Sequence, residues 1–311
     1  MSKNNAPFTP INPHHLAVFF KDTTRRVIEE IRKSRMTFIA KEKETDSKKG
    51  IDFVTNVDTK CQEIWIKHCQ EQYPFVGIIA EEIGKDGKEF FLPCSSEADK
   101  EIFFTIDPLD GTQAFIRGQS ESFGTMSSLI ERPLNQEHFD ITAACVADAM
   151  TQEIYYFRPG SEKVHRFEIG ELARKLVPNK RPLKEQYVLL RDDPRSHSES
   201  IQRITHPKDG LFKNIEVTSG SIGTNTAKLW KGQCGAYILQ GRYDTPWDWN
   251  PVAGISKKLG FRMFELSQTK MEIVTEVPLD GIRTKTIRTN SRILIHSTKI
   301  RELTNYLQSH S

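Results

Sequence analysis

The sequence predicts a mixed α and β protein in which a strand-rich part is followed by a part where strands and helices alternate. Short apolar runs separated by loops predict strands in the first part, at residues 101–106, 126–130, 143–146 and 153–157. Later strands at residues 187–190, 215–218, 236–239 and 292–295 alternate with helical patterns at residues 222–230 and 249–259. The order of predicted elements changes across the charged segment 160–184. We therefore expect two halves, at residues 12–184 and 185–311, within one structural unit.

Composition excludes several classes of function. A formal charge of +3 over 311 residues is too small to indicate binding of a nucleic acid polymer. No apolar run reaches the roughly 18 residues of a membrane span, and residues 1–10 lack the apolar core of a secretion signal. Five cysteines and nine histidines show no metal-ligand spacing. We therefore expect a cytoplasmic protein with reduced thiols and no membrane partner.

Two helices are expected near the N-terminus. Asn12 and Pro13 suit a helix start, and apolar residues at helical spacing continue the helix to about residue 33. The charged segment 41–50 is either a mobile lid or a linker. A short extended segment then ends at Asp58, which we expect to cap a second helix that stops before Pro74.

An acidic pair, Glu81 and Glu82, follows an apolar strand predicted at residues 75–80. Unpaired carboxylates beside a core are costly, and a bound cation would remove that cost. The alternative is the start of a solvent-facing loop. A hydrophilic insertion at residues 84–100 separates this pair from the central strand.

The segment Asp107-Pro108-Leu109-Asp110-Gly111-Thr112 follows the central strand. Pro108 predicts a turn, and Gly111 allows a helix to begin at Thr112. Two carboxylates beside free backbone amides suit a hard cation together with a phosphate. A solvated acidic turn is the alternative.

In the second part, Gly220 and Ser221 precede the helix predicted at residues 222–230. Asp248 lies between two tryptophans at the start of the helix predicted to follow, where it is expected to cap that helix or to belong to a packed corner. Ser297 is expected to cap a last helix.

These segments, taken together and in this order, resemble the signature of the inositol monophosphatase family of magnesium-dependent, lithium-sensitive phosphatases. The resemblance spans about residues 12–307 and includes the segment 52–58 and the Gly220-Ser221 region. It implies a layered αβαβα sandwich of the sugar-phosphatase type, an α+β half followed by an α/β half, and a homodimer.

The resemblance also implies site residues. The expected ligands of two or three Mg²⁺ ions, with Mn²⁺ possible, are Glu81, Asp107, the carbonyl of Leu109, Asp110 and Asp248. Asp58 and Thr112 match the pair that handles the proton of the attacking water, and Glu81 reaches a third ion through water. Gly111 and Thr112 would hold the phosphate, and Gly220 and Ser221 would lie on the substrate side.

The chemistry agrees with this ligand set. A phosphate monoester dianion repels hydroxide, and oxygen-ligated Mg²⁺ offsets that charge and activates a bound water. The sequence therefore predicts a phosphomonoesterase acting on a small phosphorylated metabolite by metal-activated water.

The substrate stays open because the chain departs from the family before Asp248. No acid falls where inositol monophosphatases contact the substrate hydroxyls, although Asp244 is near, and Arg242 is placed to meet a second phosphate. A 3′(2′),5′-bisphosphate nucleotidase is one alternative, and a sugar phosphate or histidinol phosphate is another possible substrate. A non-catalytic regulator that binds a phosphorylated metabolite is an alternative of another class, but such proteins usually lose the metal carboxylates that are all present here.

Overall fold

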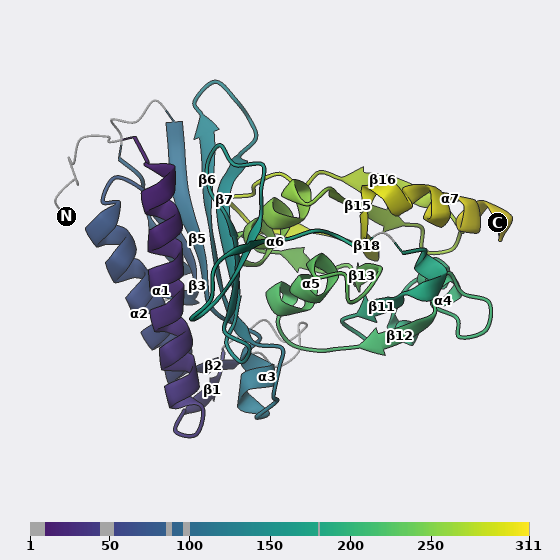
Figure 1. The fold of residues 1–311 in the computed structure, drawn as a ribbon, viewed down its shortest axis with the longest axis horizontal. Coiled ribbons are helices and arrows are strands. Elements are labelled where there is room, and N and C mark those ends of the chain that lie inside the picture. Colours follow the sequence, from purple (N-terminus) through teal and green to yellow (C-terminus); the bar gives the residue numbers. More distant parts are fainter. Residues whose placement is uncertain (1–9, 44–52, 85–88, 96–99, 180, 311) are drawn as a thin grey trace.

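The chain folds into five stacked layers in the order α, β, α, β, α, as Figure 1 shows. This is a computed structural model, and it describes residues 10–43, 53–84, 89–95, 100–179 and 181–310. The expected layered sandwich is confirmed.

The larger sheet has eight strands among the described residues, in the order β10-β9-β8-β7-β6-β5-β3-β4. Their bounds are β3 (Gly77–Ile83), β4 (Glu89–Leu92), β5 (Lys100–Asp110), β6 (Gly124–Pro133), β7 (Asp140–Asp148), β8 (Glu153–Phe157), β9 (His165–Glu168) and β10 (Arg174–Lys175). β3 runs parallel to β5, and the other neighbours are antiparallel. β5 therefore lies inside the sheet.

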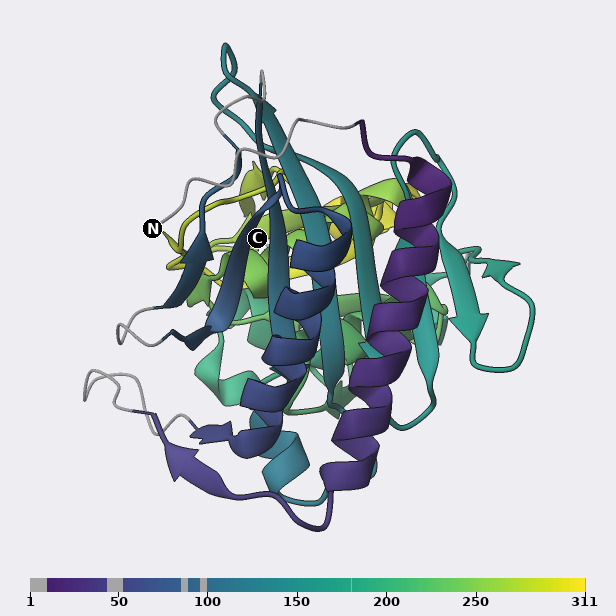
Figure 2. The same cartoon turned by 90° about the vertical axis from the view of Figure 1, so that its left-hand side faces the viewer.

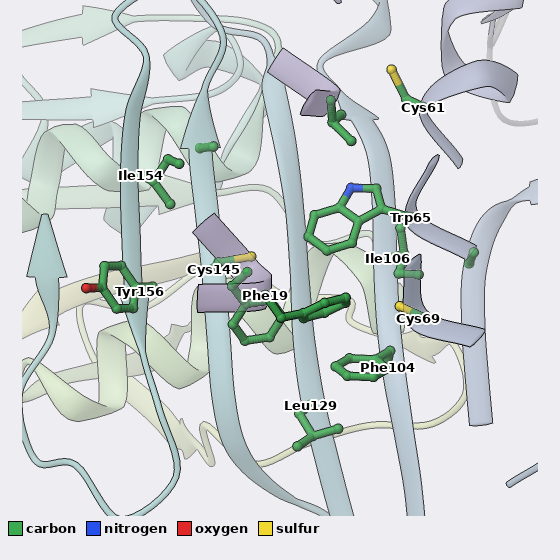
Figure 3. Close-up of a cluster of buried hydrophobic side chains, with 14 of the residues drawn as sticks. Phe19, Cys61, Trp65, Cys69, Phe104, Ile106, Leu129, Cys145, Ile154 and Tyr156 are labelled. Carbon is green, nitrogen blue, oxygen red and sulfur yellow. The ribbon is translucent and has the colours of Figure 1, made fainter. Parts of the chain in front are cut away.

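Two long helices, α1 (Pro13–Ser34) and α2 (Asn56–Gln72), cover the outer face of this sheet (Figure 2). The side chain of Asn12 accepts hydrogen bonds from the first amides of α1, as the sequence predicts. Phe19, Trp65 and Phe104 meet in the core between helices and sheet (Figure 3), with ring centroids 6.2 Å apart for Phe19–Trp65 and 5.6 Å for Phe19–Phe104. Full burial of each such ring contributes about 2–3 kcal/mol.

The smaller sheet has six strands within the described part, in the order β12-β11-β13-β18-β15-β16. Their bounds are β11 (Tyr187–Leu190), β12 (Asn214–Val217), β13 (Ala236–Leu239), β15 (Phe261–Leu266), β16 (Ile273–Val277) and β18 (Arg292–His296). Only β12, β11 and β13 pair in parallel, and the other pairings are antiparallel. The short helices α4 (Glu199–Ile204) and α7 (Ile300–Ser309) pack on its outer face (Figure 1).

The middle layer consists of α5 (Ile222–Trp230) and α6 (Pro246–Lys258), which lie between the two sheets (Figure 1). One buried cluster joins residues of both sheets and both helices, for example Val146, Phe157, Trp230, Trp249 and Leu294. The two halves of the chain thus share apolar core.

Short elements complete the described structure. They are β1 (Ala40–Glu42) paired with β2 (Phe53–Thr55), β14 (Tyr243–Asp244) paired with β17 (Thr286–Ile287), α3 (Thr112–Ile116), and 3₁₀ turns at Leu183–Glu185, Pro194–Ser196 and Ser297–Lys299. No helix in the described part is both long and apolar enough to cross a membrane.

Several expected elements differ from the structure. The insertion 84–100 contains edge strand β4, and the charged segment 160–184 contains β9 and β10, which extend the first sheet. β4 and β10 are the edge strands, and β9 beside β10 is half-buried along its length, so these strands lack the apolar alternation that marks inner strands. The last helix begins at Ile300, after a 3₁₀ turn that contains Ser297. Residues 44–50 of the predicted lid or linker lie outside the described residues.

Candidate metal and phosphate site

The acidic motif lies within β5, and the turn predicted at Pro108 is wrong. Pairing with β6 shifts between Asp107, opposite Met126, and Asp110, opposite Gly124, so two residues of β5 face one of β6. This bulge accommodates Pro108, which has no N–H for the sheet ladder. Both aspartates are thereby held at the buried end of an inner strand.

Asp248 approaches the same place from α6. The helix begins at Pro246 after the cap residue Thr245, so Asp248 is the third helical residue, and the cap role considered for it is wrong. The Thr245 hydroxyl donates to Asp248 Oδ2 at 2.5 Å. Oxygen atoms of Asp107, Asp110 and Asp248 all lie within 4.8 Å of one another.

Burial and mutual repulsion disfavour the charged form of these carboxylates. Burial and then the neighbouring acids Asp110 and Glu81 raise the pKa of Asp248 to about 7. Burial first, and then nearby acids, raise the pKa of Asp107 well above its usual value. Burial likewise raises the pKa of Asp110. Oδ1 of Asp107 is buried without a hydrogen-bond partner among the described residues. A hard divalent cation with oxygen ligands fits this donor set, because it would satisfy that oxygen and offset the repulsion.

Asp110 is held by the other half of the chain. Its carboxylate accepts hydrogen bonds from the amides of Ile222 at 3.0 Å and Gly223 at 2.7 Å, at the N-terminus of α5. The Ser221 hydroxyl also donates to Asp110, and it accepts from the amide of Thr224 at 2.8 Å. Ser221, which the sequence places on the substrate side, is engaged in orienting Asp110.

Gly111 and Gly220 both pack against the carbonyl oxygen of Ser122. Their φ angles are +90° and +97°, and a Cβ atom would lie 2.4 Å and 2.5 Å from that oxygen. The same carbonyl accepts the amide of Ser221 at 2.9 Å. Glycine at these positions thus allows β5 and the start of α5 to approach each other.

Asp58 and Thr112 are in direct contact, since the Thr112 hydroxyl donates to Asp58 Oδ1 at 2.9 Å and to the Leu109 carbonyl at 3.0 Å. The cap of α2 is Thr55, not Asp58 as predicted, and the amide of Thr55 donates to Asp58 Oδ2 at 2.7 Å. Burial raises the pKa of Asp58 to about 6, against the hydrogen bonds from Thr55. This contact joins the buried carboxylate of Asp58 to Thr112, a residue that lines the cavity beside the three aspartates.

Glu81 lies near the three aspartates but forms an ion pair with Lys43. The Lys43 Nζ atom is 2.9 Å from carboxylate oxygens of both Glu81 and Glu82. Burial, followed by the charge of Glu81, raises the pKa of Glu82 to about 8. Glu82 is therefore buried and Glu81 half-buried, both carboxylates are paired with Lys43, and the pair is not the start of a solvent-facing loop.

Two cavities meet at the site. One of about 290 Å³ is lined by the metal-site acids, Gly111, Thr112 and Gly220, and the other has about 630 Å³. Their shared lining residues are Arg191, Asp192, Arg242 and Asp248.

Arg242 and Asp244, the predicted substrate contacts, both line the larger cavity. Arg242 forms an ion pair with Asp192 at 2.9 Å. Asp244 is buried and accepts hydrogen bonds from Arg288 at 3.1 Å and Arg292 at 2.7 Å. Asp244 is thus paired with arginines in this structure.

Sequence reasoning missed Lys43, Arg191 and Asp192. Arg191 directly follows the carboxyl end of β11, which pairs in parallel with both its neighbours. Ligands in such sheets bind beyond the carboxyl ends of the strands, so this rule would have identified Arg191. Lys43 gives no comparable signal, because it lies in a charged segment.

The site can be compared with known proteins. A model of the inositol monophosphatase family matches residues 12–303. This chain belongs to the inositol monophosphatase family. The expected family and fold are confirmed by this match and by the structures below.

The chain is similar to the Nus factor SuhB of Vibrio cholerae, to which it is 30% identical over 224 residues, 70% of this chain and 73% of that protein. The crystal structure of the extragenic suppressor protein SuhB from Bartonella henselae matches with a TM-score of 0.67 at 14% identity, over 96% of this chain and 100% of that one. A structure of an IMPase/NADP phosphatase complexed with Mg²⁺ and phosphate matches with a TM-score of 0.65 at 16% identity, over 94% and 95% of the two chains.

Proposed function

We propose that this chain is a Mg²⁺-dependent phosphomonoesterase that hydrolyses a small phosphorylated metabolite. The observation that carries the proposal is a group of three aspartates, the buried Asp107 and Asp110 and the half-buried Asp248, with oxygen atoms within 4.8 Å of one another. The buried Oδ1 atom of Asp107 accepts no hydrogen bond from the described residues, which supports a cation at this position. Membership of the family supports the phosphatase class.

The residues that would hold Mg²⁺ are the three aspartates, the Leu109 carbonyl and Glu81, once Glu81 is released from Lys43. When bound, Mg²⁺ supplies positive charge that offsets the phosphate dianion, and it lowers the pKa of a bound water. Hard oxygen donors favour Mg²⁺ or Mn²⁺ over zinc.

The remaining roles belong to the chain itself. We propose that the hydrogen-bonded pair of Thr112 and Asp58 takes up the proton of the attacking water, because the pair joins the cavity to a buried carboxylate. Backbone amides at Gly111 and Thr112, which line the smaller cavity, would bind phosphate oxygens. Gly220 lines the same cavity, and Ser221 orients Asp110.

The decisive experiment is phosphate release by the wild type and by Asp110→Asn. The screen would include inositol phosphates, adenosine 3′,5′-bisphosphate, sugar phosphates and histidinol phosphate, with Mg²⁺ or with EDTA. We expect Mg²⁺-dependent release that Asp110→Asn abolishes, while the control Asp22→Asn, on the exposed face of α1, retains it. Normal turnover in Asp110→Asn, or in EDTA, would contradict the metal mechanism.

A non-catalytic regulator remains the second candidate, because a relative carries the name Nus factor. The complete acid set favours the enzyme. A chain that binds Mg²⁺ but releases no phosphate from any compound in the screen would support the regulator.

Two further properties are proposals from the family resemblance, and a third comes from the composition of the chain. We expect millimolar lithium to inhibit Mg²⁺-supported turnover, and unchanged turnover would contradict this. We expect a homodimer, which light scattering after size exclusion would test. A cytoplasmic location agrees with five free cysteines, of which Cys94 is half-buried and the others are buried.

A further inference from the structure

The larger cavity lies next to the metal site and is rich in arginine. Four arginines line it: Arg191, Arg242, Arg288 and Arg292. Apart from Asp248, which belongs to the metal site, the acids in its wall are Asp192 and Asp244. With Asp248 counted toward the metal site, the four arginines of this wall outnumber its two remaining carboxylates.

Arg242 and Arg292 are committed to carboxylates of the protein. Arg242 donates to Asp192 at 2.9 Å and to Gln240 at 3.2 Å. The buried Arg292 donates to Asp244 at 2.7 Å and lies over the ring of Trp249. These contacts hold the wall in place.

Arg288 has donors to spare. Its Nε atom donates to Asp244 at 3.1 Å, and its two terminal nitrogens form no hydrogen bond with any residue that the structure describes. The side chain is 24% exposed in the cavity wall. Its backbone is anchored, because the Arg288 amide donates to the Arg242 carbonyl at 2.8 Å beside the paired strands β14 and β17.

Arg191 connects the two cavities. It lines both, and its guanidinium forms neither a hydrogen bond nor an ion pair within the described part of the chain. It faces the charges of Asp248, Asp110 and Asp192. Arg191 thus places a cation where the metal site joins the cavity whose wall contains Arg288.

We propose that Arg288 binds a second anionic group of the substrate, a phosphate or a carboxylate, while the scissile phosphate lies at the metal site. The proposal rests on the proposed phosphatase function, and it narrows the substrate to phosphomonoesters that carry a further negative charge. A planar guanidinium with free terminal nitrogens matches the paired oxygens of either group. The neutral hydroxyls of a monophosphorylated polyol leave these donors and the excess charge unmatched.

Matched pairs of substrates test the proposal with Mg²⁺ present. The pairs are adenosine 3′,5′-bisphosphate with adenosine 3′-monophosphate, fructose 1,6-bisphosphate with fructose 1-phosphate, and 3-phosphoglycerate with glycerol 3-phosphate. Within at least one pair, we expect kcat/KM to be at least about tenfold higher for the member with the second anionic group, because that group gains a charge-assisted contact. The pair that shows the preference identifies the second group as a phosphate or a carboxylate.

The variant Arg288→Gln should reduce that preference to about threefold or less. It should lower kcat/KM for the member with the second anionic group and change kcat/KM for the other member by no more than about twofold. Asp244 keeps its contact with Arg292 in this variant, which favours folding. Arg288→Lys should fall between the wild type and Arg288→Gln, because it keeps the charge and loses the fork. The control Arg262→Gln removes an exposed arginine that pairs with Glu276 and lines neither cavity, so it should behave as the wild type.

Equal kcat/KM within every pair, or an equal loss for both members in Arg288→Gln, would overturn the proposal and leave the phosphatase function standing. If the wild type hydrolyses none of the compounds, the phosphatase function fails. In that case, calorimetric titration of the protein with each unhydrolysed compound, in the presence of Mg²⁺, tests the second-anion site. We expect about tenfold tighter binding of the member with the second anionic group in at least one pair, and loss of that preference in Arg288→Gln. Equal affinities within every pair would overturn the proposal.

Discussion

At the scale of single residues, the site consists of charges that are balanced within the protein. Lys43 neutralises part of the negative charge of Glu81 and Glu82. The three aspartates lie close together, and none of them forms an ion pair with a lysine or arginine among the described residues. Arg191 is near but forms no ion pair with them among the described residues. The electrostatic cost of the site thus depends on what binds there.

Replacing Lys43 by methionine tests this competition. The variant removes the ammonium from Glu81, so we expect Mg²⁺ to half-saturate turnover at a concentration about three- to tenfold lower, a gain of about 1 kcal/mol. Mg²⁺ titration of phosphate release, and of thermal stability, gives the value. A higher half-saturating concentration would mean that Lys43 supports the metal site.

The raised carboxylate pKa values predict how Mg²⁺ binding depends on pH. Burial and neighbouring acids raise the pKa of Asp248 from an ordinary value of 3.8 to about 7. The metal-free folded state therefore holds this proton more tightly than the unfolded state. Its contribution to stability is present at low pH and is lost as pH rises from about 4 through 7.

Mg²⁺ binds the deprotonated carboxylates, so its stabilising effect should grow with pH. We expect the increase in Tm caused by a fixed concentration of Mg²⁺ to be several degrees larger at pH 8 than at pH 6. Thermal unfolding with and without Mg²⁺ measures it, and the control Asp110→Asn should show a smaller difference. An increase that is equal at both pH values would contradict the prediction.

At the scale of elements, helix starts position the acids. Asp58 and Asp248 each occupy the third position of a helix whose cap is a threonine, and Asp110 accepts the first amides of α5. Negative charge is favoured at helix N-termini, which helps to offset the cost of burying these groups.

The cap of α2 can be removed by Thr55→Ala. This change deletes the hydroxyl that accepts from the Val57 and Asp58 amides and donates to Asp58 Oδ2. We expect a loss of about 1–2 kcal/mol in the free energy of unfolding and a lower kcat, because Asp58 loses a contact that orients it. Urea unfolding and initial rates measure the two effects, and Thr55→Ser should retain both properties. Unchanged kcat in Thr55→Ala would show that Thr55 does not orient Asp58.

At the scale of the whole molecule, the two halves meet across α5 and α6. Asp107 and Asp110 come from the first sheet, whereas Asp248 and the amides that hold Asp110 come from the middle layer. Because the halves share a core, we expect the chain to unfold as one cooperative unit. The division between residues 184 and 185 stays a prediction.

Gly254 tests this coupling, because it packs α6 against β7. A Cβ atom at this position would lie 2.6 Å from Cγ2 of Ile141. Alanine favours a helix by about 1 kcal/mol, but the clash should outweigh it, so we expect Gly254→Ala to destabilise the chain by about 1–2 kcal/mol in one urea transition. In a double-mutant cycle, Ile141→Ala should relieve part of the loss. Two separate transitions, or a gain in stability, would contradict tight coupling of the halves.

The sequence by itself determined where the main strands and helices lie, because apolar periodicity is a local pattern. Its ordered acidic motifs determined the family, and the resemblance to that family implied the layered fold. The helices at residues 13–34 and 222–230 and the strand at residues 187–190 lie close to where these patterns predict them. Strands β4, β9 and β10 and the bulge at Pro108 were missed, because they depend on pairing with other strands of the sheet.

Only the tertiary structure showed which of the predicted acids come together. Asp107, Asp110 and Asp248 are separated by up to 141 positions in the chain numbering, yet their oxygen atoms lie within 4.8 Å. It also placed Lys43 on Glu81, Ser221 on Asp110, and Arg288 in the wall of the larger cavity. Residue type and spacing specify which chemistry is available. Charge pairing and burial depend on contacts between segments that are distant in sequence, and these contacts form only when the two sheets pack on α5 and α6.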